Sequence, residues 1–243
     1  LEALTRFERG AKGLYLMPNC HNPTGTTISL ARREALIAWS HKAGVPLIED
    51  DYGADLDLDG VPAPCAMRSL DGQVIYLGTF SKKLIPALRV GFILCPRGLR
   101  PKLGQLKHTM DLCTSPLLQY ALAEFIERGY MRAHLNRILP EYRQRRDALE
   151  AALTEHMPEG VTWRHPRRGV VLWLELPPGV DAEQVFDEAL REGVVVTPGS
   201  VHGVDDSSRS GVRLTFCCEP ADRLAIGARR LGRALARVRP TLH

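Results

Sequence analysis

Four short apolar runs that alternate with helix-like segments constrain the fold of this chain most strongly. We expect strands at residues 13–17, 45–48, 74–77 and 90–94. Ser29 can cap a helix between the first two runs, and Gly44 can end it. Strands that alternate with helices imply βαβ units and an α/β fold class. The last two runs are apolar throughout, as expected for a parallel sheet that is covered on both faces.

Polar residues follow the ends of three predicted strands. Asn22 comes after the first strand, Asp50 after the second and Lys82 after the third. Ligands of open α/β sheets bind at the carboxyl ends of the strands. We therefore expect these three side chains to project from one sheet edge and to share one site.

The stretch Gly78-Thr79-Phe80-Ser81-Lys82-Lys83 suits a phosphorylated aldehyde. Arg89 follows Lys82 by seven residues. A lysine amine can form an imine with a carbonyl, while hydroxyl groups and a guanidinium hold a phosphate. Taken alone, the stretch also fits a surface turn, and Lys83 competes with Lys82 for the covalent role.

Four stretches in a fixed order carry a resemblance to a known family. They are Asn22-Pro23-Thr24-Gly25, Glu49-Asp50-Asp51-Tyr52, the stretch 78–83, and Arg213. Together they resemble the class I/II aminotransferases of fold type I, which use pyridoxal 5'-phosphate (PLP). His21 before the first turn looks most like the subgroup that includes MocR-type regulators of the GntR family, whose C-terminal domain is aminotransferase-like. The resemblance covers nearly the whole chain.

The resemblance implies the PLP-dependent transferase fold type I. We expect part of the large, mostly parallel-sheet domain at 1–130, a linking helix at 131–157 and a small α+β C-terminal domain at 158–243. Pro140 should kink the linking helix. The chain starts at Leu1, and nothing matches the glycine-rich phosphate loop that precedes this point in the family. We therefore expect the C-terminal part of a longer protein.

The resemblance implies that Lys82 and Asp50 carry the chemistry. Lys82 would bind PLP through an imine and, once displaced by the substrate amine, would move a proton. Asp50 would pair with the pyridine nitrogen and keep it protonated, so that the ring accepts electrons. Glu49 and Asp51 remain rivals, because all three acids stand together at a strand end.

Five further residues are implied contacts of the cofactor. Tyr52, which is also implied in catalysis, and Asn22 would hydrogen-bond the phenolic oxygen and tune the pKa of the imine. Thr79, Ser81 and Arg89 would hold the phosphate, which a guanidinium can bind with two parallel hydrogen bonds. Asn22 could instead cap a turn, and Tyr52 could instead be a packing residue.

Arg213 and Asn22 are the implied substrate contacts. Arg213 would bind the α-carboxylate of the substrate. It stands between Val212 and Leu214 on a predicted strand, where an unpaired charge would be costly. A structural salt bridge is the alternative reading of this arginine.

Composition and charge exclude several classes of protein. With 243 residues and 44% hydrophobic content, the chain can bury a sizeable core, and its net charge of +4 is mild. We interpret basic clusters such as Arg143-Arg145-Arg146 as solvated helix faces, with nucleic-acid contact as the alternative. No apolar run approaches the roughly 20 residues of a membrane span, and no signal peptide is visible, so we expect a cytoplasmic protein. The six cysteines show no metal-binding spacing.

Two main function classes stay open. The first is a homodimeric PLP-dependent aminotransferase, which transfers an amino group between an amino acid and a 2-oxo acid. The second is a PLP- or amino-acid-sensing domain of a MocR-type regulator, which would meet DNA only through a segment missing from this chain. A non-catalytic fragment is a third reading. His21, His108 and His202 are interpreted as structural.

Overall fold

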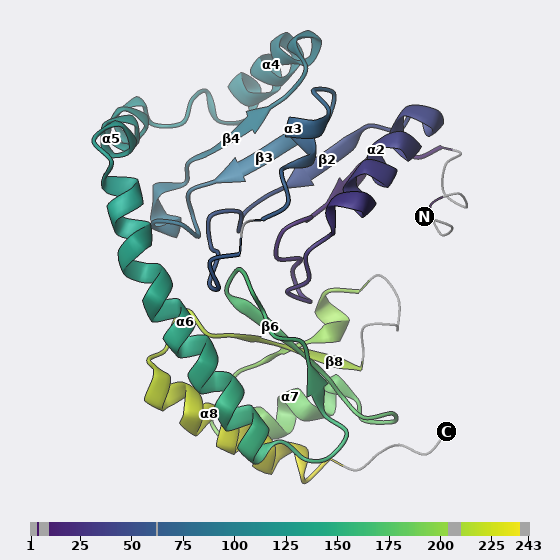
Figure 1. Ribbon diagram of the computed structural model, residues 1–243, viewed down its shortest axis with the longest axis vertical. Coiled ribbons are helices and arrows are strands. Elements are labelled where there is room, and N and C mark those ends of the chain that lie inside the picture. Colours follow the sequence, from purple (N-terminus) through teal and green to yellow (C-terminus); the bar gives the residue numbers. More distant parts are fainter. Residues whose placement is uncertain (1–3, 5–9, 62, 204–209, 239–243) are drawn as a thin grey trace. The chain divides into compact units, whose positions relative to one another are not determined.

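The computed structural model describes residues 4, 10–61, 63–203 and 210–238 (Figure 1). The chain divides into two compact units. Unit 1 comprises residues 1–20, 26–57 and 61–136, and unit 2 comprises residues 21–25, 58–60 and 137–243. The division falls inside the long helix α6 (Tyr130–His156), which continues through Pro140. The domain boundaries expected from the sequence stay a prediction.

Unit 1 is built on a four-stranded mixed sheet (Figure 1). Its strands, in the order in which they pair, are β1 (Leu14–Leu16), β2 (Leu47–Asp50), β3 (Ile75–Thr79) and β4 (Gly91–Leu94). The first three strands are parallel, and β4 is antiparallel to β3. The α/β class and the mostly parallel sheet are therefore confirmed.

Strand β4 departs from the prediction of a parallel strand that is covered on both faces. Its four residues are all exposed, and Ile93 is 51% accessible. An apolar run predicts that a strand exists, but its direction depends on the path of the chain between strands. Here only the short 3-10 helix η1 (Pro86–Leu88) stands between β3 and β4, too little for the crossover that a parallel pair requires.

The helices of unit 1 begin and end largely where local signals place them. Helix α2 (Leu30–Ala43) is capped by Ser29, whose hydroxyl accepts the N–H of Arg32, and it ends at Gly44 in the left-handed region with φ 66°. The remaining helices are α3 (Met67–Leu70), α4 (Arg100–Asp111), α5 (Pro116–Glu127) and the 3-10 helix η2 (Arg97–Leu99). The start and end of α2 are confirmed, whereas α4 was not expected.

Unit 2 packs two helices and the C-terminal part of α6 on a four-stranded antiparallel sheet. The strands, in the order in which they pair, are β5 (Thr162–Trp163), β6 (Val171–Glu175), β8 (Gly211–Thr215) and β7 (Thr197–Pro198). The apolar run at 194–196 suggests a strand, but only the next two residues, Thr197 and Pro198, pair with β8. Val194 and Val196 instead contribute to the core as irregular chain.

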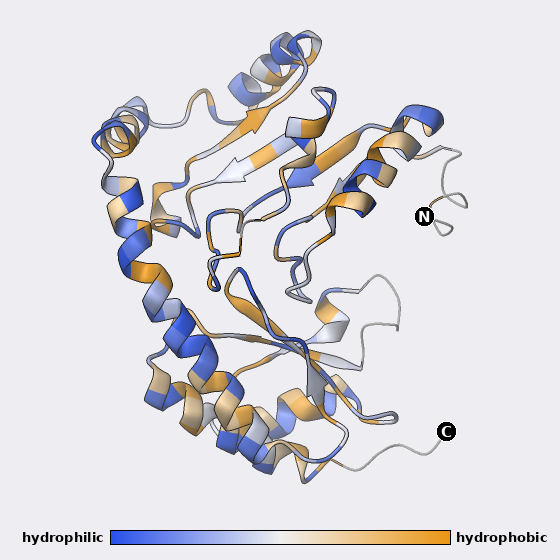
Figure 2. Ribbon diagram, viewed as in Figure 1, coloured by the Kyte–Doolittle hydropathy of each residue, from blue (hydrophilic) through white to orange (hydrophobic). Residues whose placement is uncertain are grey.

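Helices α7 (Ala182–Arg191) and α8 (Ala221–Leu235) contribute one face each to the core of unit 2. In Figure 2 the colour of α8 alternates between apolar and polar, as expected for a helix with one buried side. Val212 and Leu214 of β8 point into this core. The 3-10 helix η3 (Gly199–Val201) follows β7. Because strand side chains alternate, Arg213 lies on the opposite face of the sheet.

None of the described helices is both long enough and apolar enough to cross a membrane.

Candidate functional site

The three acids at the end of β2 have different environments, which separates their roles. Glu49 is fully buried, and its carboxylate accepts the backbone N–H groups of Met67 at 3.0 Å and Arg68 at 2.9 Å. Arg33 lies 3.8 Å away. Burial raises the pKa of Glu49, although these donors oppose that shift. Glu49 therefore anchors the start of α3.

Asp51 is also buried and structural. Its carboxylate accepts hydrogen bonds from the amide of Asn19 at 3.1 Å and the hydroxyl of Tyr76 at 3.0 Å. Burial raises the pKa of Asp51, against the effect of both donors. No signal in the sequence pointed to Asn19 or Tyr76 as partners of this acid.

Asp50 is the partly exposed acid of the three. Its carboxylate accepts the hydroxyl of Tyr15 on the neighbouring strand β1. Burial, followed by the hydrogen bond and the charge of Asp50, raises the pKa of Tyr15. Of the three acids, Asp50 is thus the one whose side chain is still accessible to a ligand. This supports the prediction that Asp50, rather than Glu49 or Asp51, pairs with the cofactor.

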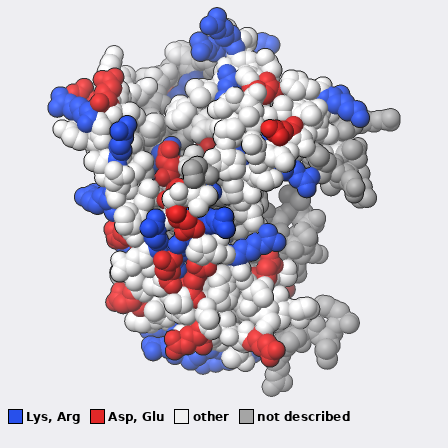
Figure 3. Space-filling model, in the orientation of Figure 1, with Lys and Arg blue, Asp and Glu red and all other residues white. Residues whose placement is uncertain are grey.

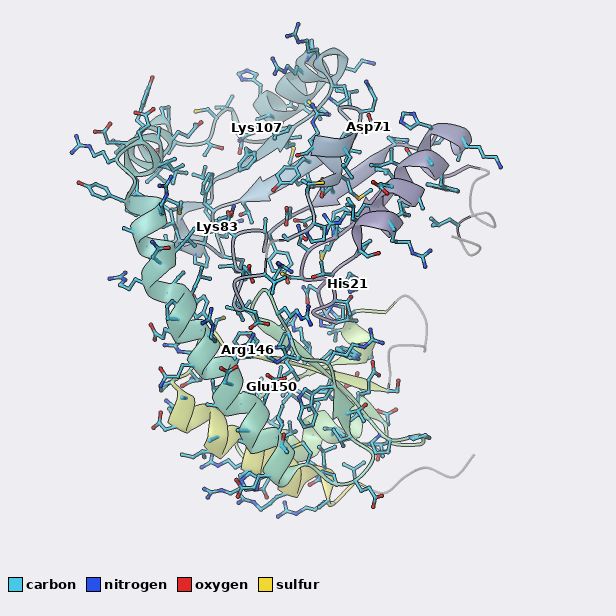
Figure 4. All side chains as sticks on the ribbon, in the orientation of Figure 1. His21, Asp71, Lys83, Lys107, Arg146 and Glu150 are labelled. Carbon is cyan, nitrogen blue, oxygen red and sulfur yellow. The ribbon has the colours of Figure 1, made fainter. Side chains whose placement is uncertain are left out.

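The two neighbouring lysines also differ. Lys83 is 8% accessible and forms an ion pair with Asp55, and its carbonyl contacts the ring of His134 at 3.0 Å (Figure 4). Lys82 is exposed and makes no hydrogen bond or ion pair with any described residue. Lys83 is held by unit 1 itself, whereas the amine of Lys82 is available to react.

The predicted phosphate contacts lie around the end of β3. The hydroxyl of Thr79 accepts the backbone N–H of Ser81 at 3.1 Å, so both hydroxyls belong to one turn. Thr79 pairs with Gly91 of the antiparallel strand β4, and Arg89 precedes that glycine by two residues. Arg89 is exposed and adopts φ 52°, a region that non-glycine residues rarely occupy. The pairing therefore brings Arg89 to the sheet edge at which β3 ends.

Asp50 lies at this same edge. It pairs with Leu77, two residues before Thr79, and β2 and β3 run in the same direction. Tyr52 stands two residues after Asp50 in the sequence. Its hydroxyl donates a hydrogen bond to the carbonyl of Cys20 at 2.6 Å. Unit 1 therefore gathers an amine, a carboxylate, hydroxyls and a guanidinium at one sheet edge, while the contact of Tyr52 with a cofactor stays a prediction.

Asn22 and Arg213 meet within unit 2. Nη1 of Arg213 donates to Oδ1 of Asn22 at 2.9 Å, and Nη2 donates to Oγ1 of Thr197 at 3.1 Å. Among the residues that the structure describes, Arg213 has no carboxylate partner. The structural salt bridge considered as an alternative is therefore not found in that part of the chain, and the guanidinium keeps donors for a ligand.

Two neutral imidazoles adjoin this arginine. Burial lowers the pKa of His202, and the charges of Arg213 and His21 lower it further. Burial also lowers the pKa of His21, whose Nδ1 lies 2.9 Å from Oγ1 of Thr24 (Figure 4). Both shifts favour the uncharged form of the ring, so Arg213 is the permanent positive charge near His202.

The basic cluster on α6 is not a solvated helix face at every position. Arg146 is 3% accessible and pairs with Asp59 at 2.6 Å and Asp147 at 2.8 Å. Figure 4 shows Arg146 and Glu150 along α6. The expectation was wrong for Arg146 because its acidic partner Asp59 is distant in sequence. On the face drawn in Figure 3, acidic and basic side chains are intermingled rather than gathered by sign.

The described residues contain no cluster of three or more side chains that could hold a metal ion. None of the six cysteines, all of which lie in the described part of the chain, forms a disulfide.

Comparison with known proteins places these observations in a family. The family model described as "Aminotransferase class I and II" matches residues 1–231. Aromatic-amino-acid aminotransferase 1 of Thermococcus litoralis is 33% identical over 236 residues, which are 97% of this chain and 57% of that protein. The uncharacterized HTH-type transcriptional regulator YdfD of Bacillus subtilis is 33% identical over 231 residues, 94% of this chain and 47% of that protein.

Solved structures show the same relationship. The structure of LysN, the alpha-aminoadipate aminotransferase of Thermus thermophilus, was determined with N-(5'-phosphopyridoxyl)-L-leucine. It superposes with a TM-score of 0.89 at 34% identity, covering 97% of this chain and 62% of LysN. The chain thus spans less than two thirds of the length of these relatives. It belongs to the aminotransferase class I and II family.

Proposed function

We propose that the protein is a PLP-dependent aminotransferase, which transfers an amino group between an amino acid and a 2-oxo acid. The observation that carries the proposal is the sheet edge of unit 1, where Lys82 is unpaired among the described residues and Asp50 is partly exposed. Membership of the family and the cofactor adduct bound to LysN support the same reading.

The donor set of unit 1 fits the groups of PLP one by one. An unpaired amine, Lys82, suits the aldehyde, and a carboxylate, Asp50, suits the pyridine nitrogen. Hydroxyls of Thr79 and Ser81, with the guanidinium of Arg89, suit the phosphate. When bound, PLP supplies a ring that accepts electrons from the substrate Cα.

Each side chain then has a definite task. Lys82 holds the cofactor and, as a free amine, accepts the proton from the substrate Cα. Asp50 holds a proton at the pyridine nitrogen. The hydroxyls of Thr79 and Ser81 donate hydrogen bonds to phosphate oxygens, and the guanidinium of Arg89 adds two charge-assisted hydrogen bonds. Tyr52 would hydrogen-bond the phenolic oxygen.

Arg213 binds the α-carboxylate shared by amino acids and 2-oxo acids. Its guanidinium has no acidic partner among the described residues, so the substrate does not have to displace one. Asn22 accepts one of its donors at 2.9 Å. The full protein acts as a homodimer in the cytoplasm, a compartment in which cysteines without disulfides are usual.

A second candidate is an effector domain of a transcriptional regulator. The match to the HTH-type regulator YdfD, at 33% identity over 94% of this chain, favours it. The residues at the sheet edge and around Arg213 serve both functions, since a sensor also holds PLP and an amino acid.

Turnover separates the two functions. The full-length protein, loaded with PLP, is mixed with an amino acid and then with a 2-oxo acid that corresponds to a different amino acid. The proposal expects many equivalents of the new amino acid per protein molecule. A spectral change without turnover, together with DNA binding that responds to the amino acid, would favour the regulator.

A further inference from the structure

We infer that Thr197 is a positioning residue for the substrate carboxylate, because its hydroxyl fixes the guanidinium of Arg213. The inference rests on the proposed role of Arg213 in binding that carboxylate. None of the sequence motifs includes Thr197.

The sheet of unit 2 places the two residues opposite each other. Thr197 on β7 and Arg213 on β8 are antiparallel partners in the register. Side chains of directly opposite residues lie on the same face of a sheet, with Cβ atoms roughly 5 Å apart. The distance of 3.1 Å between Oγ1 of Thr197 and Nη2 of Arg213 is a regular hydrogen bond.

The hydroxyl of Thr197 is held in place by local covalent structure. Threonine is branched at Cβ, so its χ1 angle has few accessible values. Pro198 follows, which restricts the backbone of Thr197 to extended conformations. Pro198 in turn pairs with Val212, next to the arginine. The acceptor is therefore fixed before any ligand arrives.

Two neutral acceptors hold opposite terminal nitrogens of the guanidinium. Asn22 accepts from Nη1 at 2.9 Å, and Thr197 accepts from Nη2 at 3.1 Å. An arginine has five N–H donors in one plane, so each terminal nitrogen keeps a second donor and Nε keeps its own. Hydrogen bonds at both terminal nitrogens fix the plane of the guanidinium. A carboxylate needs a guanidinium in a fixed plane to form two parallel hydrogen bonds with it.

The neutrality of these acceptors matters as much as their position. A carboxylate at either place would neutralise Arg213 and compete with the substrate. An amide and a hydroxyl orient the guanidinium without reducing its charge. Thr197 thus contributes to binding through Arg213 rather than by touching the reacting atoms.

Thr197→Val and Thr197→Ser form a matched pair for the test. Valine keeps the shape and the branching of threonine and removes the hydroxyl, whereas serine keeps the hydroxyl. In the full-length, PLP-loaded protein, Thr197→Val should raise KM for both the amino acid and the 2-oxo acid by about 3- to 10-fold, roughly the net contribution of one ordinary hydrogen bond, because the lost contact acts on the substrate only through Arg213. The kcat value should change little, because the contact is made equally in the ground state and the transition state. Thr197→Ser should restore most of the affinity.

A crystal structure of Thr197→Val should show the Arg213 guanidinium turned away from its wild-type plane. Unchanged KM values with the guanidinium in place would overturn the inference and leave the proposed function standing. A loss of thermal stability that serine does not repair would assign Thr197 a purely structural role and overturn it as well. A wild-type protein that binds no amino acid would overturn the proposed function first, before any variant is compared.

Discussion

The guanidinium of Arg213 donates to the amide oxygen of Asn22 at 2.9 Å, across 191 residues of sequence. The first and last of the recognised motifs are therefore joined by a direct hydrogen bond within unit 2. An asparagine that only capped a turn would have no need of this partner. The bond gives Asn22 a second task, which is to orient the arginine proposed to bind the substrate.

Arg213→Ala should weaken the binding of amino acids by about 10- to 150-fold. A charge-assisted hydrogen bond contributes about 1.5–3 kcal/mol, which corresponds to this range. PLP should remain bound, because Arg89, and not Arg213, is proposed to hold its phosphate. Spectral titration of the full-length protein measures the affinity for the amino acid. The affinity of Arg213→Lys should lie between those of Arg213→Ala and wild type, because lysine keeps the positive charge but cannot form two parallel hydrogen bonds. Retained affinity, or a loss that follows unfolding alone, would make Arg213 structural.

Asp50→Asn and Asp51→Asn should fail in different ways. Asp50 is partly exposed, so its variant should fold and bind PLP but should lose the half-reaction with an amino acid by several orders of magnitude. Asp51 is buried between Asn19 and Tyr76, so its variant should lose stability by about 1–3 kcal/mol. Single-turnover kinetics and urea unfolding separate the two effects. An unchanged single-turnover rate in Asp50→Asn would move the catalytic role elsewhere.

Sequence patterns predicted the candidate site residues of unit 1, but they did not reveal the contacts that distinguish each candidate from its neighbours. Strand ends and motif order predicted Asp50 and Lys82. The structure argues against their rivals Asp51 and Lys83 through partners that local sequence does not reveal, such as Asp55 for Lys83. Partners of this kind depend on the three-dimensional path of the chain.

The same distinction between local and distant signals applies to the fold. The ends of α2 follow from Ser29 and Gly44, which act within one helical turn. The direction of β4 and the burial of Arg146 depend on elements elsewhere, so sequence reasoning missed both. Thr197 was missed for the same reason, since only the pairing of β7 with β8 brings it to Arg213.

The stability of the protein should fall as the pH is lowered below about 6.5, because His21 and His202 have lowered pKa values in the folded state. Between the unfolded and folded pKa values, the unfolded chain binds more protons, so acid favours unfolding. The histidine contribution is complete above the unfolded pKa and is lost as the pH falls through the folded values.

Urea unfolding at about pH 7.5 and about pH 5.5 measures this slope. The His202→Gln variant should show a shallower slope than wild type, and His108→Gln, on the exposed helix α4, should not. Equal slopes in all three proteins would remove the histidines from the acid response.

Gly232→Ala and Gly227→Ala should have opposite effects, although both lie on α8. A Cβ atom at Gly232 would stand 2.2 Å from the carbonyl oxygen of His156, a backbone atom that cannot turn aside, whereas at Gly227 nothing lies within 4 Å. We expect a loss of about 1–3 kcal/mol for Gly232→Ala. We expect a gain of up to about 1 kcal/mol for Gly227→Ala from helix propensity. Urea unfolding of each variant measures the change, and similar values for both would contradict the packing of α8 against the end of α6.

The central claim is that Lys82 carries the cofactor, and covalent labelling tests it most directly. Borohydride reduction of the full-length, PLP-loaded protein fixes the bond between the cofactor and its lysine, and peptide mapping then identifies the residue. Lys82→Ala should abolish the label, while Lys83→Ala serves as the matched control and should retain it. We expect a single label on Lys82; a label on Lys83, or no labelled lysine at all, would show that Lys82 does not carry the cofactor.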